Sequence, residues 1–238
     1  MIWLRGLTQV GPRPLKRFYF LFFNINHIAI LIGVFVMTIY KTNYGKSFDE
    51  AFSWVMEKEG IVLTYDPDDP GGMTLCGISR EHNPNWEWWS EIDRAIASKK
   101  LKVNTKVPEE FISIYVASYY YNTYWLKYGC AEANVSNELA KEMFDQAINP
   151  GPSIMIRNLQ ECLNTLNYDT KTKSTKSEDL VVDGKWGKKT RTRLIEYAGK
   201  YNSFLVKAMN AKQASYYLSL SSSNVKMRKY VKGWMNRV

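Results

Sequence analysis

The chain has 238 residues, with 32 Lys and Arg against 23 Asp and Glu, and 45% of its residues are hydrophobic. A chain of this length and composition buries enough apolar surface for one or two domains, which excludes disorder as its main state. Five basic residues precede Tyr44 and no acidic residue precedes Asp49, so the net charge of +9 falls to +4 in the remainder. Nucleic-acid binding, which needs clustered basic residues, is therefore not favoured, whereas a polyanionic cell wall or lipid headgroups fit equally well.

Histidine and cysteine are scarce. Only His27 and His82 occur, and neither an H-E-x-x-H motif nor a paired-cysteine pattern is present. Zinc hydrolases normally need two or three His ligands at fixed spacing, so the sequence predicts no metal and no other cofactor. Three cysteines (Cys76, Cys130, Cys162) allow at most one disulfide, and a domain of this size does not require one.

An uncharged run of 23 residues extends from Phe18 to Tyr40. As a helix, at 1.5 Å per residue, it would be long enough to cross the roughly 30 Å of a membrane's hydrocarbon. Three polar residues interrupt it (Asn24, Asn26, His27). The alternative, a helix buried in a soluble domain, is less favoured because such helices are rarely apolar on every side over this length.

The charges around this run predict its orientation. Arg13, Lys16 and Arg17 precede it, which places the N-terminus in the cytoplasm. No small-residue cleavage site follows, so the segment is expected to stay attached as a signal anchor. The sequence therefore predicts a cytoplasmic tail and anchor over residues 1–46. The protein would be single-pass in the inner (cytoplasmic) membrane, with its catalytic region in the periplasm or outside the cell.

A helix is predicted to begin at Ser47, because Ser47 and Glu50 form a capping box. Its apolar stripe is Phe48, Phe52 and Val55, and one further step along the stripe reaches Glu59, before the helix stop at Gly60. A carboxyl group on the core-facing side, at the negative end of the helix dipole, should have a raised pKa, which suits a general acid. The alternative is that Glu59 turns outward with the last turn of the helix.

An acidic loop follows at residues 66–74 (DPDDPGGMT), where two prolines forbid regular structure and paired glycines allow close approach of a ligand. A calcium loop is excluded, because Pro70 and Gly77 occupy the positions that would need an oxygen ligand and a Glu. The functional interpretation is a second carboxylate facing Glu59 across a cleft. The alternative is a plain surface turn.

The rest of the chain is predicted to be helical. One helix begins at Pro108, and others are expected over 136–148, 153–166, from a Thr190 cap onwards, 204–220 and 230–237. Aromatic residues concentrate in 83–89 (NPNWEWW) and 119–125 (YYYNTYW), where they either stack on sugar rings or, for most of them, fill the core. Residues 169–179 should form a solvated loop. No segment alternates as a strand, so the fold class is all-α.

Several motifs occur in a fixed order: E-G, D-P-x-D-P-G-G-x-T, G-I, Y-W, F-D-x-A-x-N-x-G, L-Q, D-G-x-x-G-x-x-T and G-W-x-x-R. Together, from about Phe48 to Arg237, they resemble glycoside hydrolase family 108. Members of that family are peptidoglycan muramidases with a lysozyme-like helical fold and a C-terminal helical module described as peptidoglycan-binding. The resemblance implies a catalytic region at 47–148 and a binding module at 149–238.

The resemblance also implies roles for individual residues. The catalytic acid falls on Glu59, and the Pro-Gly loop supplies Asp66 and Asp69 as candidates for the second catalytic group, with Thr74 as a water-positioning hydroxyl. Substrate-binding positions are implied along the remaining motifs (Gly71, Gly72, Trp125, Asp145, Asn149, Gln160, Asp183). The family pattern begins E-G-G-Y, whereas Ile61 and Val62 follow Glu59-Gly60 here, and one extra residue precedes the loop.

The expected function is therefore that of a lysozyme, an N-acetylmuramidase that hydrolyses the β-1,4 bond between N-acetylmuramic acid and N-acetylglucosamine. Glu59 would protonate the leaving oxygen. The expected partners are peptidoglycan glycan strands and, through residues 18–40, the cytoplasmic membrane, with no nucleic acid and no metal. The protein is expected to be a monomer.

Two other functions compete with this one. The first is a non-catalytic, membrane-tethered peptidoglycan-binding protein, which the departures at Ile61 and Val62 favour. The second is a cysteine amidase or peptidase that uses Cys76 and His82, although no third orienting group is evident.

Overall fold

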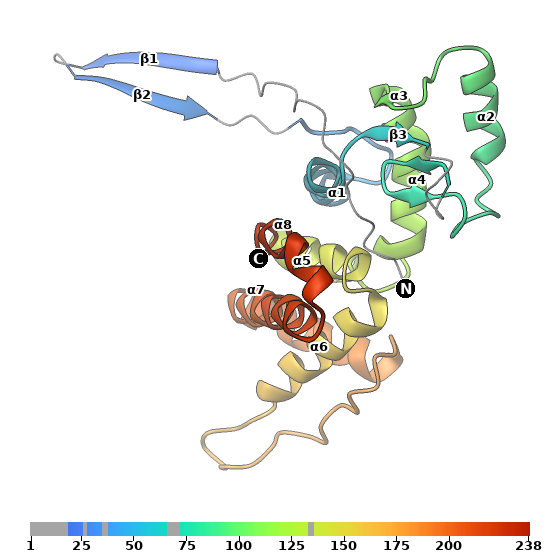
Figure 1. Ribbon diagram of the computed structural model, residues 1–238. Coiled ribbons are helices and arrows are strands. Elements are labelled where there is room, and N and C mark those ends of the chain that lie inside the picture. Colours follow the sequence, from blue (N-terminus) through green and yellow to red (C-terminus); the bar gives the residue numbers. More distant parts are fainter. Residues whose placement is uncertain (1–18, 26–27, 35–37, 66–71, 133–135) are drawn as a thin grey trace.

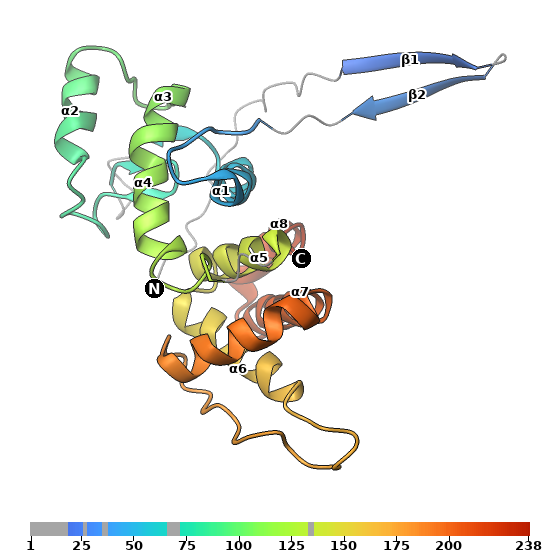
Figure 2. The same ribbon diagram turned by 180° about the vertical axis from the view of Figure 1, so that it is seen from behind.

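The computed structural model describes residues 19–25, 28–34, 38–65, 72–132 and 136–238. Helices form most of this part of the chain, with a small antiparallel sheet at one end and a separate β-hairpin extending away from the body (Figures 1 and 2). The expected all-α class is therefore wrong in one respect, because the catalytic region contains a four-stranded sheet.

The predicted signal anchor is not a helix in the described part of residues 18–40. Strands β1 (Tyr19–Ile25) and β2 (Ile28–Val34) pair antiparallel there, with Tyr19 opposite Val34 and Ile25 opposite Ile28. Among the described residues, the structure has no helix with the length and apolarity needed to span a membrane. The predictions of a single-pass membrane topology and of the membrane as a partner are therefore wrong. The run is rich in Phe, Ile and Val, which favour strands, and its uncharged length does not distinguish the two structures.

Helix α1 (Lys46–Glu59) begins one residue before the predicted cap. Gly45 is its N-cap at φ +98°, and the backbone N–H of Asp49 donates to the Gly45 carbonyl. The hydroxyl of Ser47 is buried and has no hydrogen-bond partner in the described structure, so the capping-box prediction is wrong. Asp49 instead accepts hydrogen bonds from the backbone N–H and hydroxyl of Thr42, which fixes the chain leading into the helix.

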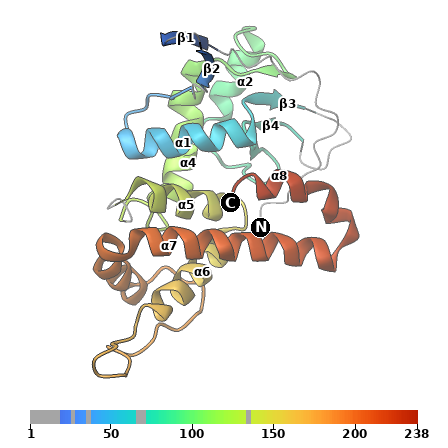
Figure 3. The same cartoon turned by 90° about the vertical axis from the view of Figure 1, so that its left-hand side faces the viewer.

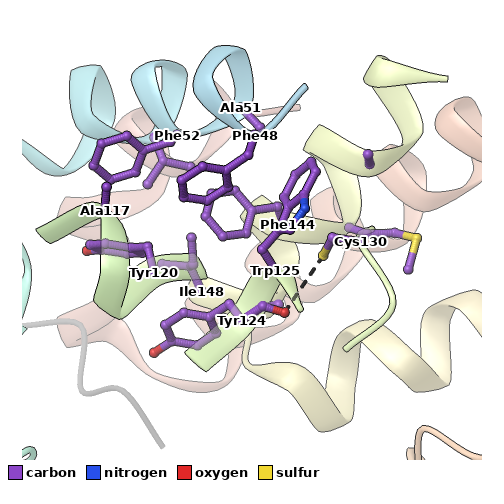
Figure 4. Packing of buried hydrophobic residues seen from close by; sticks show 14 of the residues in the cluster. Phe48, Ala51, Phe52, Ala117, Tyr120, Tyr124, Trp125, Cys130, Phe144 and Ile148 are labelled. Atoms are coloured by element: carbon purple, nitrogen blue, oxygen red, sulfur yellow. Dashed lines mark hydrogen bonds between the residues drawn. The ribbon is translucent and has the colours of Figure 1, made fainter. Parts of the chain in front are cut away.

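The helical segment after Pro108 forms, but in pieces. Short α-helices α3 (Glu109–Phe111) and α4 (Ala117–Tyr120) alternate with the π-helical turns η1 (Ile112–Val116) and η2 (Tyr121–Trp125). Its aromatic side chains pack against α1 (Figure 4): Phe48 lies edge-on to Trp125 at 5.4 Å, and Phe52 lies 5.9 Å from Tyr120. Most rings of 119–125 therefore fill the core, and they hold α1 in place.

The sheet that the sequence did not reveal has the order β5-β4-β3-β6. Its strands are β3 (Val62–Thr64), β4 (Thr74–Leu75), β5 (Ile78–Ser79) and β6 (Thr105–Lys106). Leu63 pairs with Leu75 and Thr105, and Leu75 pairs with Ile78. Helix α2 (Trp89–Ala97) also lies in this region and was not predicted. The sheet begins three residues after Glu59, so it forms one side of the region around that carboxyl group.

The remaining helices confirm the predicted ranges to within a few residues. Helix α5 (Asn137–Ile148) is capped by the Ser136 hydroxyl, which accepts from the Leu139 N–H, and α6 (Pro152–Thr165) follows. Helix α7 (Lys188–Ser223) has Gly187 rather than Thr190 at its N-cap and a kink at Tyr201. The polar loop 169–179 is mostly exposed, as expected.

After α7 the chain reverses through the 3₁₀ helix η3 (Val225–Tyr230) into α8 (Val231–Met235). Figure 3 shows α1, α5 and α7 as successive layers, with α8 returning between α1 and α7. Helix α5 contacts both α1 and α7, so the parts before and after residue 149 share a continuous core. This return path brings residues 236–238 back to the end of α1.

The interface between α5 and α7 contains a buried carboxyl group. Glu142 is 6% exposed and accepts a hydrogen bond from the Gln146 amide at 2.7 Å, and that amide also donates to the Met209 carbonyl. Burial raises the pKa of Glu142 to about 7. Between its unfolded pKa and about 7, the folded protein binds the proton more tightly, so stability falls as pH rises across this window.

Glu142→Gln is therefore expected to stabilise the protein at pH 8 by up to about 3 kcal/mol, and by progressively less toward pH 5. The amide stays neutral but can still accept from Gln146. Urea denaturation at several pH values measures the difference. Glu138→Gln, one turn earlier on the exposed face of α5, should show no such gain. A gain in stability of equal size at pH 5 and pH 8 would contradict the raised pKa of Glu142.

Candidate active site

Glu59 is the last residue of α1, and its side chain is 23% exposed. Gly60 ends the helix at φ +87°, with its N–H bonded to the Met56 carbonyl, as the sequence predicted. Phe48, Phe52 and Val55 are fully buried on the same stripe. The carboxyl group therefore lies at the edge of the core, where it is both desolvated and reachable.

Arg237 lies between two carboxylates. Its Nη2 donates to Glu59 Oε1 at 2.8 Å, and its Nη1 donates to Asp145 Oδ1 at 2.8 Å. The Arg237 side chain is 10% exposed and that of Asp145 is 1% exposed. The three charged groups come from α1, α5 and the segment after α8, so the site is assembled from both parts of the chain.

Asp145 is held by more donors than Glu59. Besides Arg237, it accepts from the side-chain amides of Asn149 at 2.8 Å and Gln213 at 2.7 Å. Gln213 also contacts the hydroxyl of Tyr217 in α7. Arg237 is the donor that the described structure provides for Glu59. Because hydrogen bonds to a carboxylate favour its charged form, Asp145 is the better-stabilised anion of the two.

Burial raises the pKa of Glu59, and the nearby charge of Asp145 raises it further, while the charge and hydrogen bond of Arg237 lower it. The net direction is upward, as the sequence predicted from the helix stripe. One cation thus lies between two carboxyl groups, and the less well satisfied of them is the partly exposed one. Burial raises the pKa of Asp145 as well, while the charge of Arg237 and the hydrogen bonds from Gln213 and Arg237 lower it.

The turn between β4 and β5 lies against Glu59. Cys76 and Gly77 form this two-residue turn with φ values of +46° and +86°, both positive as a type I′ hairpin requires. The Tyr120 hydroxyl donates to the Cys76 carbonyl at 2.9 Å. A Cβ atom at position 77 would lie 2.6 Å from the Tyr120 hydroxyl and 3.6 Å from Glu59 Oε2. A side chain here would therefore crowd the Tyr120 hydroxyl, while its Cβ would be in ordinary contact with the Glu59 carboxyl group.

The candidates for the second catalytic group belong to the chain segment between β3 and β4. Asp66, Asp69 and Gly71 lie outside the described residues. Thr74 begins β4 opposite Thr64, and Gly72 has a φ of +58°.

Apart from the two loop glycines, the residues proposed for substrate binding lie either near the aromatic core and Asp145 or around the turn that contains Asp183, which is only half-buried. Trp125 is 3% exposed within the aromatic core, while Asn149 supports Asp145. Gln160, 2% exposed, binds Asp183 Oδ1, Thr190 and the Gly184 N–H, and so holds the turn of the D-G-x-x-G-x-x-T motif. The side chains of Asp145, Asn149, Gln160 and Asp183 all make hydrogen bonds within the protein, and their substrate-binding role stays a prediction.

The structure does not favour the cysteine amidase or peptidase. Cys76 is 1% exposed, and burial raises the pKa of its thiol to about 12, so the reactive thiolate is disfavoured. His82 is exposed, and its Nδ1 lies 3.0 Å from the Ser79 hydroxyl. All three cysteines are free and buried.

A hollow of about 350 Å³ is lined by residues that follow β5 in the chain and by residues of the helical segment after Pro108. We call it the aromatic hollow; its lining residues are His82, Asn83, Pro84, Asn85, Trp86, Tyr119 and Thr123. Trp86 is half-buried and edge-on to Trp89 and Tyr119, and the Tyr119 hydroxyl donates to the Asn83 side chain. Asn83 in turn donates to the carbonyl of Ser79, two residues beyond Gly77. Strand β5 thus connects the surroundings of Glu59 to the aromatic hollow.

Comparison with known protein families agrees with this arrangement. Residues 52–151 match the family described as Glycosyl hydrolase 108, and residues 155–238 match the one described as Predicted Peptidoglycan domain. No curated protein matches the chain. A solved structure described as "Structure of Brucella abortus SagA" is 19% identical, with a TM-score of 0.46, and the alignment covers 80% of this chain and 88% of that one.

The chain is therefore a glycoside hydrolase that acts on peptidoglycan. More particularly, residues 52–151 match the glycosyl hydrolase 108 family, and residues 155–238 match the predicted peptidoglycan domain. The family resemblance carried by the sequence motifs is confirmed.

Proposed function

We propose that this protein is an N-acetylmuramidase that cleaves the β-1,4 bond after N-acetylmuramic acid. Glu59 is the general acid, which protonates the glycosidic oxygen as that oxygen leaves the N-acetylmuramic acid unit. The observation that carries the proposal is a partly exposed carboxyl group with a raised pKa, set against a glycine turn in a glycosyl hydrolase 108 domain. A carboxyl group with a raised pKa keeps its proton to higher pH than usual and can deliver it to a bound substrate. Asp66 and Asp69 stand as candidates for the second group, and Thr74 as a water-positioning hydroxyl.

Residues 149–238 are proposed to contribute binding of peptidoglycan. From 151 onwards this part has 17 Lys and Arg against 6 Asp and Glu. Peptidoglycan carries carboxylates on its muramic acid units and stem peptides, so the excess positive charge is complementary to the substrate. The rival function, a peptidoglycan-binding protein without activity, would use the same charge.

Digestion of purified sacculi tests the proposal. A muramidase yields fragments with N-acetylmuramic acid at the reducing end, which borohydride converts to muramitol. A glucosaminidase leaves N-acetylglucosamine there, a lytic transglycosylase forms an anhydro end, and an amidase or peptidase releases free amines. A protein that only binds peptidoglycan attaches to the sacculi and releases none of these products. Muramitol is the expected product, and any other result would reject the muramidase.

The aromatic hollow is proposed to bind a sugar of the same glycan strand. Strand β5 leads from the turn beside Glu59 to Ser79, whose carbonyl accepts from Asn83 in the hollow, so a glycan strand bound at Glu59 is proposed to continue into it. The half-buried ring of Trp86 offers a stacking surface, with the amide of Asn85 and the imidazole of His82 beside it.

Trp86→Ala is accordingly expected to raise KM for sacculi about tenfold with little change in kcat, because stacking binds substrate and transition state alike. Trp54→Ala is the matched control: Trp54 is also half-buried, but it contacts Lys58 and Lys141 on α1 and α5. An equal rise of KM in both variants, or a loss confined to kcat, would argue against a sugar site.

A further inference from the structure

We propose that Arg237 is a positioning residue for Glu59 and that Asp145 tunes this role by taking up part of the Arg237 charge. The inference deepens the proposed function, since it rests on Glu59 being the acid. It assigns an active-site role to the C-terminal region beyond binding of the wall, through a residue 178 positions away from Glu59.

The first step of the argument is geometric. A guanidinium group presents its donors in a rigid plane, so an Arg bound to two carboxylates fixes the orientation of both. Asp145 is immobilised on the other side by Asn149 and Gln213. Arg237 is thereby held in place, and its Nη2 determines where Glu59 Oε1 points.

The second step concerns charge. A lone Arg at 2.8 Å from Glu59 would hold the carboxyl group ionised, which would prevent it from donating a proton. Asp145 accepts from the other end of the guanidinium group and offsets its charge. Removing Arg237 should therefore strengthen proton binding to Glu59, and removing the charge of Asp145 should weaken it.

Other groups facing this cluster come from every element packed around it. Tyr120 and Tyr124 lie near Glu59, Tyr217 lies beside Asp145 and Arg237, and Lys58 acts on Asp145. Burial raises the pKa of each of these tyrosines. They stay neutral over the pH range in which Glu59 would titrate. The Glu142 carboxyl, on the same helix as Asp145, also interacts with Asp145 and has a pKa of about 7. It is present in every variant compared, so the opposing effects of Arg237 and Asp145 are the ones that the variants separate.

The test compares Arg237→Met, Arg237→Lys and Asp145→Asn in the full chain. The Asp145→Asn variant can keep its hydrogen bond to Gln213. Gln213 Oε1 is buried without a partner in the described structure, so a flip of the Gln213 amide would let this oxygen accept from the NH₂ group introduced at position 145. Arg228→Met is the matched control, since Arg228 is an exposed arginine in the neighbouring η3 and does not contact Glu59 in the described structure.

Two measurements are made on each variant. The first is the pH profile of reducing-end release, whose alkaline limb reports loss of the proton from the acid. The second is the ¹³C titration of the Glu59 carboxyl in glutamate-labelled protein, with its signal assigned by its disappearance in Glu59→Gln. The second does not depend on activity, so it decides the inference even if the wild-type protein releases no reducing ends and the proposed function fails.

In Arg237→Met, both the titration of Glu59 and the alkaline limb should move to higher pH, and the maximal rate should fall about 10- to 100-fold as the carboxyl loses its orientation. In Asp145→Asn they should move to lower pH. Arg237→Lys keeps the charge with a less directional contact, so its midpoint should stay near that of the wild type while its rate falls.

Opposite shifts are the critical result, because a purely structural role would lower thermal stability without moving the midpoint in either direction. If Arg237→Met does not fold, Asp145→Asn and Arg237→Lys still decide the question. Unchanged midpoints in folded variants, or shifts in the same direction for Arg237→Met and Asp145→Asn, would overturn the inference.

Discussion

Glu59→Gln is expected to lower the rate of reducing-end release from sacculi by a factor of about 10² to 10⁴, while the protein stays folded and still binds the wall. The amide has nearly the same shape as the carboxyl group, and its oxygen can accept the hydrogen bond that Arg237 donates to Glu59. It has no acidic proton to transfer to the glycosidic oxygen. Initial rates at the pH optimum, with sacculus pull-down and thermal denaturation alongside, measure the effect.

Glu57→Gln serves as the matched control. Glu57 lies two residues earlier in α1 and is exposed, so the same chemical change is made on the same helix but off the core-facing stripe. Its rate should stay within a factor of about two of wild type, as expected for a surface substitution. A folded Glu59→Gln variant with wild-type turnover would remove Glu59 from the proposed mechanism.

The position of Glu59 could be predicted because it depends on local order. The row Phe48, Phe52, Val55 fixes the buried face of α1, and adding one step to that row requires no knowledge of the rest of the chain. The pKa direction followed from the same stripe. The helices α5 and α6 were predicted for the same reason, because their apolar spacing recurs over three turns.

The strands of the sheet could not be predicted in this way. Each of β3 to β6 has two or three residues, too few for an alternating pattern to be recognised, and they form because distant backbones pair. The prediction of a helix over residues 18–40 was wrong for the opposite reason. A long uncharged pattern fits both a spanning helix and paired apolar strands, and its strand-forming composition received too little weight.

The contact between Glu59 and Arg237 could not be predicted from the sequence either. Arg237 belonged to a recognised motif, but a contact across 178 positions leaves no local signal. Asp145 was identified as a substrate-binding position from family resemblance. In the structure it accepts three hydrogen bonds from side chains of the protein itself. A motif can mark a residue as part of a site without revealing what it contacts there.

The glycine at position 77 should be as sensitive as the acid itself. Gly77→Ala would place a Cβ 2.6 Å from the Tyr120 hydroxyl, closer than two such atoms can approach, and 3.6 Å from Glu59 Oε2. Tyr120 is buried and its hydroxyl is bonded to the Cys76 carbonyl, so it cannot simply turn away. Either the turn or the ring must shift, and both border the carboxyl group.

The rate is therefore expected to fall about 10²-fold, as for a misplacement of about 1 Å at a reacting group. Gly45→Ala separates this effect from backbone strain alone. Gly45 also has a positive φ, +98°, but a Cβ there would meet no atom within 4 Å. Both variants should lose roughly 1 to 3 kcal/mol of stability, because a residue with a side chain is strained at a positive φ. Only Gly77→Ala should lose activity at a temperature where both are folded, and an equal loss in Gly45→Ala would show that strain, rather than crowding of Glu59 and Tyr120, is responsible.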